Sequence, residues 1–135
     1  MTPRAVPTTT ADAASVLAAS MSEGALLAHV RRAARSLGWL TYHTHRSEHS
    51  EAGFPDLVLC HPRRGQLVFA ELKVEHEKRG ALTTAQEKWL DALEAVHGDV
   101  YVWRPSDWLS GRIESVLGGG AEATALAVNA RRLTQ

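Results

Sequence analysis

The chain has 135 residues, of which 44% are hydrophobic and 22% charged, and this composition is typical of one globular domain around one core. Its 15 basic and 15 acidic residues cancel, whereas nucleic-acid-binding domains are usually basic, so such a role has to depend on local clusters of charge. Met1 to Thr10 lack the order of a secretory signal and no apolar run is long enough for a bilayer, so we expect no membrane contact. A single cysteine, Cys60, excludes an internal disulfide and predicts a reducing compartment such as the cytoplasm.

The first predicted helix begins near Ser20 and ends at Gly38. Residues 1–19 are rich in Thr, Ala and Pro, so we expect a flexible arm there, with at most a short helix near 11–19. Ser20 and Glu23 have the spacing of a capping box, and glycine commonly ends a helix. Apolar residues then recur at helical spacing on one face: Leu26, Leu27, Val30, Ala33, Ala34 and Leu37.

The remaining predicted elements are, in chain order, strands at 39–45, 56–61 and 66–74, a helix from Thr83 or Thr84 to Gly98, a strand at 100–104 and a helix from Pro105 to about Leu117. The turn at 62–65 indicates an antiparallel hairpin, and the helix before the last strand indicates a parallel crossover. The order α-β-β-β-α-β-α therefore predicts an α/β fold, a mixed four-stranded sheet flanked by helices. We place this folded unit at 20–117, with a glycine hinge and an Ala-rich tail at 118–135.

Three charged residues lie at the ends of predicted strands. Asp56 opens the second strand directly after Pro55, and Glu71 and Lys73 are two residues apart in the third, so both point to one face, roughly 6–7 Å apart. The third strand is otherwise apolar and therefore central, where ionised groups are rare unless they are paired or bind a metal. The alternatives remain that Asp56 is a turn residue and that Glu71 and Lys73 face solvent or pair with each other.

Two further polar residues point toward the core side of predicted helices. Glu23 lies three, four and seven residues before Leu26, Leu27 and Val30, so it falls on the apolar face, and we expect Arg31, Arg32 and Arg35 on the opposite side. Gln86 has the same spacing to the apolar residues that follow it. Capping of the helix starts is the alternative for both residues.

The seven histidines do not form a zinc-binding pattern, because Cys60 has no partner cysteine and no ligand spacing is complete. We interpret them as scattered surface residues, although His43 or His45 could contact a phosphate or orient a water. Among the basic residues, Arg46, Lys78 and Arg79 are expected on loops beside Asp56 and Glu71, so they are the best candidates for phosphate contacts.

These strings resemble a known nuclease group. The sequences GFPDL at 53–57 and ELK at 71–73 resemble the PD-(D/E)xK nuclease signature. The sequence GALTTAQ at 80–86, followed by Trp89, Leu93, Gly98 and residues 100–103, resembles the virus-type replication-repair nuclease branch, VRR-NUC. The resemblance covers about residues 20–108 and implies a restriction-endonuclease-like core. The segment between Tyr42 and Phe54 departs from the pattern, because it is longer and richer in His and Glu, and this leaves the choice of substrate open.

The resemblance also implies a role for each site residue. It makes Asp56, Glu71 and the Leu72 carbonyl metal ligands, Lys73 the catalytic lysine and Gln86 the glutamine at a helix start. Glu23 matches the acidic residue of the first helix, and we count it among the predicted metal ligands, where it could help to hold a second metal or position Lys73. Elementary chemistry agrees, because Mg²⁺ takes oxygen ligands and keeps several waters.

We therefore expect a Mg²⁺-dependent DNA endonuclease in which Mn²⁺ can substitute. The resemblance favours action on branched DNA, as in a Holliday-junction resolvase, during replication, recombination or repair in a bacterial or phage setting. A homodimer would suit paired cuts. The alternatives are a module of the same fold that binds nucleic acid without cutting it, and a protein-interaction domain that docks through residues 118–135.

Overall fold

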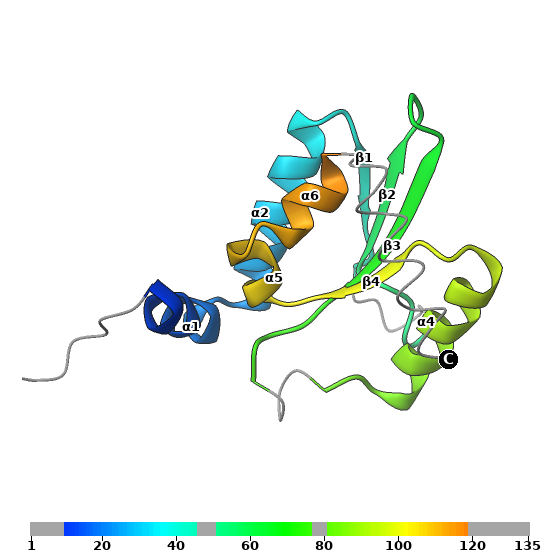
Figure 1. Ribbon diagram of the computed structural model, residues 1–135. Coiled ribbons are helices and arrows are strands. Elements are labelled where there is room, and N and C mark those ends of the chain that lie inside the picture. The colour runs from blue at the N-terminus through cyan, green and yellow to red at the C-terminus, as the bar shows by residue number, and fades with distance from the viewer. Residues whose placement is uncertain (1–9, 46–50, 77–80, 119–135) are drawn as a thin grey trace, which may run out of the picture.

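The structure, a computed structural model, describes residues 10–45, 51–76 and 81–118 (Figure 1). Its elements in chain order are α1 (Thr10–Ser20), α2 (Glu23–Ser36), β1 (Leu40–His43), β2 (Leu57–His61), β3 (Gln66–Leu72), α4 (Thr84–Val96), β4 (Val100–Trp103), α5 (Pro105–Leu109) and α6 (Arg112–Leu117).

The four strands form one mixed sheet in the order β1-β2-β3-β4. β1 pairs with β2, and β2 with β3, in antiparallel fashion, with Leu57 opposite Ala70 and His61 opposite Gln66. β3 and β4 are parallel, because α4 carries the chain back between them. The predicted mixed four-stranded sheet, with a hairpin and a crossover, is therefore confirmed.

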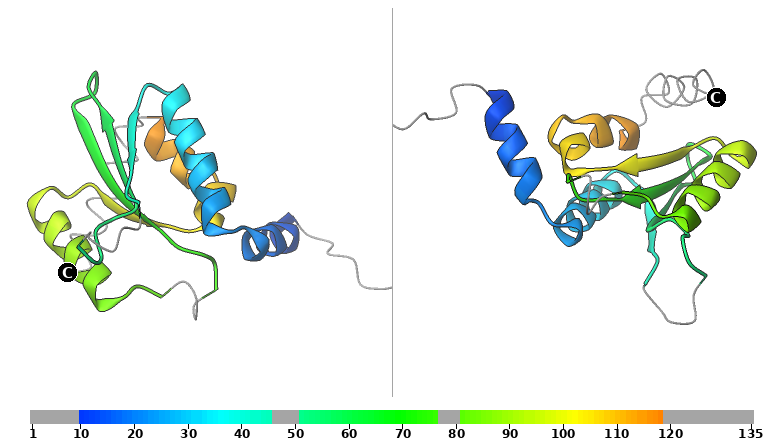
Figure 2. Two further views of the ribbon diagram at one scale, coloured as in Figure 1. Left: turned by 180° about the vertical axis from the view of Figure 1, so that it is seen from behind. Right: turned by 90° about the horizontal axis from the view of Figure 1, so that it is seen from below.

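Helices cover the sheet on both faces. α2, α5 and α6 lie together on one face and α4 lies on the other (Figures 1 and 2). The first face carries the main core, in which the side chains of Leu26, Val30 and Ala34 on α2 are fully buried with the alternating strand residues. These strand residues include Leu57, Leu59, Val68, Ala70 and Leu72.

An aromatic cluster fixes α4 on the second face. Phe54, just before β2, makes edge-on contacts with Phe69 of β3 and Trp89 of α4, at centroid distances of 6.1 and 5.2 Å. Edge-to-face packing of this kind adds to the stabilisation from buried area. The cluster sets the position of the first turn of α4 relative to the ends of β2 and β3.

The structure corrects the predicted start of the first long helix. The cap is Ser22, whose Oγ accepts a hydrogen bond from the Ala25 backbone at 3.0 Å, whereas Ser20 is the last residue of α1. Glu23 is thus the first helical residue and not the third, so it is not the glutamate of a capping box with Ser20.

Two chain ends also differ from the expected elements. The last helix is divided into α5 and α6, because Gly111 between them adopts a left-handed conformation with φ 80°. Residues 10–20 form α1, which agrees with the short helix expected near 11–19. It packs against α5 and buries Ala18, so this part of the chain is a docked helix and not a flexible arm. Residues 119–135, which contain most of the expected tail, lie outside the described part of the chain.

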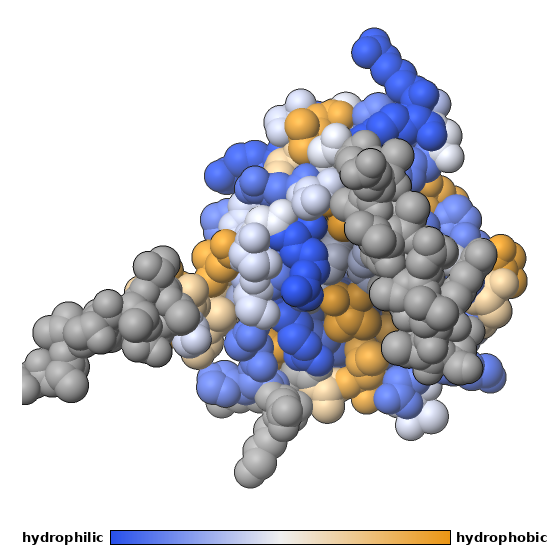
Figure 3. Space-filling model, viewed as in Figure 1, coloured by the Kyte–Doolittle hydropathy of each residue, from blue (hydrophilic) through white to orange (hydrophobic). Residues whose placement is uncertain are grey.

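The surface is mixed in polarity. In the view of Figure 1, hydrophilic residues gather in a band at the middle of the face, and apolar residues form smaller separate groups (Figure 3). Within the described residues no single helix is long and apolar enough to cross a bilayer; one pair, Ala13–Ser20 with Glu23–Ser36, passes that test together but is bent by 103°.

Gly53 generates a test of how the loop before β2 meets α4. Its φ is 93°, and a Cβ at this position would overlap the backbone carbonyl of Ala85. We expect Gly53→Ala to lower the free energy of unfolding by at least about 2 kcal/mol, because it adds a steric clash to an unfavourable backbone conformation. Chemical denaturation measures the change.

Gly65→Ala is the matched control, because Gly65 also has a positive φ, 59°, but no atom lies within 4 Å of its added Cβ. It should cost about 1 kcal/mol, the conformational part alone. Equal destabilisation by the two substitutions would show that the contact between Gly53 and α4 is not tight.

Candidate metal centre

Glu71 is a buried carboxylate near the end of the central strand. Only 2% of its surface is exposed, although β3 is otherwise apolar toward this end. In the sheet, Glu71 lies opposite Val102 of β4. Its side chain, like those of Phe69 and Lys73, is on the face of the sheet that α4 covers and not on the face of the main core. Lys73, directly after β3, is 9% exposed. The alternative that Glu71 and Lys73 face solvent is therefore wrong.

Asp56 is held beside the end of β3 by backbone contacts. Its Oδ2 accepts a hydrogen bond from the Leu72 backbone N–H at 2.8 Å, and its own carbonyl accepts one from the Thr44 N–H at 2.8 Å. Pro55 is buried and its carbonyl accepts a bond from the Thr44 hydroxyl at 2.9 Å. Asp56 thus joins the start of β2 to the end of β3, and its remaining lone pairs can accept a cation.

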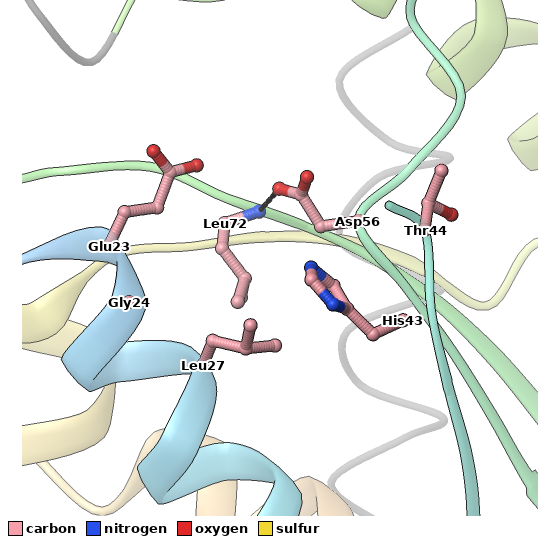
Figure 4. Close-up of a pocket in the computed structure, with 7 residues that line it drawn as sticks. All are labelled: Glu23, Gly24, Leu27, His43, Thr44, Asp56 and Leu72. Atoms are coloured by element: carbon pink, nitrogen blue, oxygen red, sulfur yellow. Dashed lines mark hydrogen bonds between the residues drawn. The ribbon is translucent and has the colours of Figure 1, made fainter. Parts of the chain in front are cut away.

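Glu23 reaches the same point from the other face of the sheet. It begins α2, whose N-terminal end lies at the end of the sheet where β2 starts and β3 stops (Figure 4). One carboxylate oxygen from each of Glu23, Asp56 and Glu71 lies within 4.8 Å of the others. The fold therefore assembles into one cluster three acidic residues that lie at least 15 positions apart in the sequence.

Gln86 connects α4 to this cluster. Thr83 and Gln86 form the predicted capping box, in which the Gln86 Oε1 accepts a bond from the Thr83 N–H at 2.9 Å. The Gln86 Nε2 also donates to Glu71 Oε1 at 3.0 Å. Both interpretations of Gln86 are thus correct, and one side chain caps the helix while it orients a carboxylate.

The environment of Glu71 disfavours its charged form. Burial, as the largest cause, together with the nearby Asp56 and Glu23 carboxylates raises the pKa of Glu71 to about 8, against the opposing effect of the Lys73 ammonium. Its Oε2 is buried and has no hydrogen-bond partner among the residues that the structure describes. A buried carboxylate oxygen with no donor has lost its interactions with water, and a cation would compensate that loss.

The donor set fits a magnesium or manganese ion. Three carboxylates supply oxygen ligands from one side, and hard divalent cations of this size prefer oxygen. The Leu72 carbonyl lies on the same side of β3 as the Leu72 N–H, because both groups of a strand residue point the same way, and that N–H bonds Asp56. The predicted ligands Glu23, Asp56, Glu71 and the Leu72 backbone therefore lie together.

A pocket of about 270 Å³ opens beside the carboxylates. Its lining residues come from α2, the end of β1, the start of β2 and the end of β3: Glu23, Gly24, Leu27, His43, Thr44, Asp56 and Leu72. The His43 ring points into this space between Leu27 and Asp56 (Figure 4). Burial lowers the pKa of His43, as do His45 and Arg31, whereas Asp56 raises it.

The candidate nucleic-acid contacts are placed less completely. His45 is exposed and packs its ring on His43 at 5.0 Å without lining the pocket, so its contact with nucleic acid stays a prediction. Arg46, Lys78 and Arg79 lie outside the described residues. Arg31 departs from the expected exposed face, because it is half-buried and its charge acts on His43.

Sequence reasoning did not identify Leu27 and Thr44, which line the pocket. Leu27 reads as an ordinary core residue, and its position one helical turn after Glu23 was the only available signal. Thr44 reads as one of several strand threonines, and its bonds to Pro55 and Asp56 depend on strand pairing that the sequence does not show.

Comparisons with known proteins assign the family. A model of the VRR-NUC domain matches residues 9–107 of the chain, which includes every residue of the carboxylate cluster. No curated protein matches the chain, and no solved structure matches it either. The mixed sheet flanked by helices agrees with the restriction-endonuclease-like fold of this group. The chain therefore belongs to the VRR-NUC family of nucleases.

Proposed function

We propose that this chain is a metal-dependent deoxyribonuclease that hydrolyses phosphodiester bonds with a water as the nucleophile. The observation that carries the proposal is the cluster of Glu23, Asp56 and Glu71, with oxygens within 4.8 Å of one another, beside the ammonium-bearing Lys73. The metal is Mg²⁺, with Mn²⁺ able to replace it, because all ligands on offer are oxygens. A module that only binds nucleic acid gains nothing from carboxylates that face phosphates.

Each residue has a distinct task. When bound, Mg²⁺ acts as a Lewis acid toward the phosphate and makes a coordinated water more acidic. Asp56 and Glu71 hold the cation, and Glu23 completes the acidic side or positions Lys73. Lys73 orients the attacking water and neutralises charge that develops on the phosphate, because its compact ammonium group is a mobile donor. Gln86 fixes the orientation of Glu71 through its amide.

The finer substrate choice is also a proposal. The replication-repair character of the family supports branched DNA as the substrate, and a homodimer would deliver two symmetric cuts at a junction. A reducing compartment, such as a bacterial or phage-infected cytoplasm, suits a chain whose only cysteine is Cys60.

The central prediction concerns the carboxylates and the lysine. Asp56→Asn, Glu71→Gln and Lys73→Met should each lower kcat for DNA cleavage at least about 100-fold, because each removes a charge that acts on the metal or on the transition state. Asp56→Asn keeps an oxygen that can accept the Leu72 N–H, so the fold should be retained. Cleavage of branched and linear DNA with Mg²⁺ or Mn²⁺ is the measurement, and EDTA should abolish it.

Asp91→Asn is the matched control, because Asp91 is an exposed carboxylate on α4. It should cut as wild type does. A wild-type protein that cuts no DNA with either metal, or site variants as active as Asp91→Asn, would show that the cluster is not an active site.

A second prediction follows from the raised pKa of Glu71. Folding of the metal-free protein takes up a proton between pH 4.5 and about 8, because the folded state holds the Glu71 proton more tightly than the unfolded chain. Relative to Glu71→Gln, the wild type should therefore lose stability as the pH rises through this range, by roughly 1–3 kcal/mol. Below pH 4.5 the difference should be smallest, since Glu71 is then neutral in both states.

Thermal or urea unfolding in EDTA at pH 4.5, 6 and 8.5 measures this difference. Added Mn²⁺ should stabilise the wild type at pH 8.5 and should stabilise Glu71→Gln much less, because only the folded wild type offers the full ligand set. A pH-independent difference would mean that the Glu71 carboxyl keeps its ordinary pKa in the folded protein.

A third prediction separates the two tasks of Gln86. Thr83→Ala removes the helix cap alone and should cost about 1 kcal/mol of stability with little effect on kcat. Gln86→Ala removes the cap partner and also the donor to Glu71, so it should cost similar stability but lower kcat about 10-fold and raise the Mg²⁺ concentration needed for half-maximal rate. Equal kinetic effects of the two variants would limit Gln86 to capping.

A further inference from the structure

A basic side chain lies along the wall that leads away from the carboxylate cluster. On α2, Leu27 follows Glu23 by one turn and Arg31 follows Leu27 by another, so Arg31 lies about 12 Å along the helix from Glu23. β1 runs beside this part of α2, and its residues Thr41 and His43 share one face of the strand. Arg31, Thr41 and His43 thus border one seam between α2 and the edge strand.

Arg31 differs from the other two arginines of α2. Arg32 and Arg35 are exposed, whereas Arg31 is half-buried and its Nε is fully buried. That Nε has no hydrogen-bond partner within the described ranges, and the Thr41 hydroxyl is likewise buried without a partner there. Burial of the Nε without a partner costs free energy and partly desolvates the guanidinium. An anionic ligand at the accessible part of this half-buried side chain would stabilise its charge.

The electrostatic neighbours indicate where such a ligand would sit. Both Arg31 and Asp56 are close enough to His43 for their charges to act on its ring, so His43 has the guanidinium and the acidic cluster as neighbours. The described residues place no carboxylate within ion-pair distance of Arg31. His43 lines the pocket beside the acidic cluster, whereas Arg31 is not among the residues that line it. The cationic end of the seam is therefore separate from the acidic end that would hold the metal.

The chemistry that suits this seam is a backbone phosphate. Arginine presents planar N–H donors that match phosphate oxygens, and it stays charged at every accessible pH. Because Arg31 is two helical turns from Glu23, it is too far to hold the phosphate that is cut, but it is in range of a phosphate further along the same strand. A neighbouring phosphate fixes the register of the strand without carrying sequence information.

We propose that Arg31, assisted by the His43 ring, forms a phosphate subsite that binds the DNA backbone one or two nucleotides from the bond to be cut. The proposal rests on the proposed nuclease function, because that function places the bond to be cut at the carboxylate cluster and so sets the path of the DNA strand past Arg31. Its contribution is to binding and positioning of DNA, so Arg31 should act on KM and on affinity more than on kcat.

Binding of DNA tests the subsite without cleavage. Fluorescence anisotropy of a labelled duplex and a branched DNA, in EDTA and over a series of salt concentrations, compares Arg31→Gln with Arg35→Gln, which removes the same charge from an exposed position on the same helix. We expect Arg31→Gln to weaken binding about 10-fold and to reduce the slope of log K against log salt by about 0.9, and Arg35→Gln to change affinity less than about 2-fold. Arg31→Lys, which keeps the charge but loses the planar donors, should fall between them.

Neutral phosphates locate the contact. Single methylphosphonate substitutions are placed at each of the three phosphates on either side of the cut, and kcat/KM is measured with Mg²⁺. One flanking position should be sensitive in wild type and in Arg35→Gln but not in Arg31→Gln, because the variant has already lost that contact.

The outcomes separate the subsite from the nuclease proposal. If Arg31→Gln and Arg35→Gln both cut DNA, bind it equally well and respond equally to the methylphosphonates, the subsite is overturned and the nuclease proposal stands. Selective loss of binding in Arg31→Gln, in a protein that cuts nothing, supports the subsite and overturns the nuclease. Circular dichroism and thermal unfolding confirm that each variant is folded before the comparison is made.

Discussion

The burial of a carboxylate at the end of the central strand is the constraint on which the rest of the site depends. Glu71 is 2% exposed and its Oε2 has no donor among the described residues, so the fold leaves one strong acceptor unsatisfied in its interior. Such a group destabilises a protein unless a proton or a cation compensates it. The raised pKa of Glu71 corresponds to compensation by a proton. The adjacent carboxylates of Asp56 and Glu23 provide further oxygen ligands for compensation by a cation. In the proposed nuclease, stability given up at this point would be the basis of the affinity for a metal.

The sheet brings residues from both of its faces to that point. α2 packs on one face and contributes Glu23, while α4 packs on the other and contributes Gln86. Within the sheet, the hydrogen bond from the Leu72 N–H to Asp56 holds the start of β2 at the end of β3. Because the aromatic contacts of Phe54 fix α4 and the apolar stripe of α2 fixes Glu23, the cluster is supported by the packing of both layers. A binding site held by rigid elements keeps its geometry better than one built on loops.

The sequence was informative where a local pattern and the tertiary structure agree. The alternation of Val68, Ala70 and Leu72 against Glu71 predicted the central strand, and the turn at 62–65 predicted the hairpin, because both depend on neighbouring residues. Helix starts were less certain: Ser20 and Ser22 both precede Glu23, and the choice of Ser22 depends on where α1 ends. The division of the last helix at Gly111 was also missed, since a glycine can be tolerated within a helix or can end it.

The site followed from sequence only in part. Glu23, Glu71 and Gln86 could be predicted because each is a polar residue where the local pattern calls for an apolar one, and Asp56 because it follows Pro55 at the start of a strand. Arg31 was misplaced, because a helical wheel gives the direction of a side chain but not the tertiary packing that leaves it half-buried. The most direct test of the central claim is a crystal structure after a Mn²⁺ soak, with the ion located by its anomalous scattering. The account predicts one strong peak within bonding distance of oxygens from Asp56, Glu71 and the Leu72 carbonyl, with Glu23 on the same side. A saturating soak that leaves this point without a peak, or places the ion elsewhere, would contradict it.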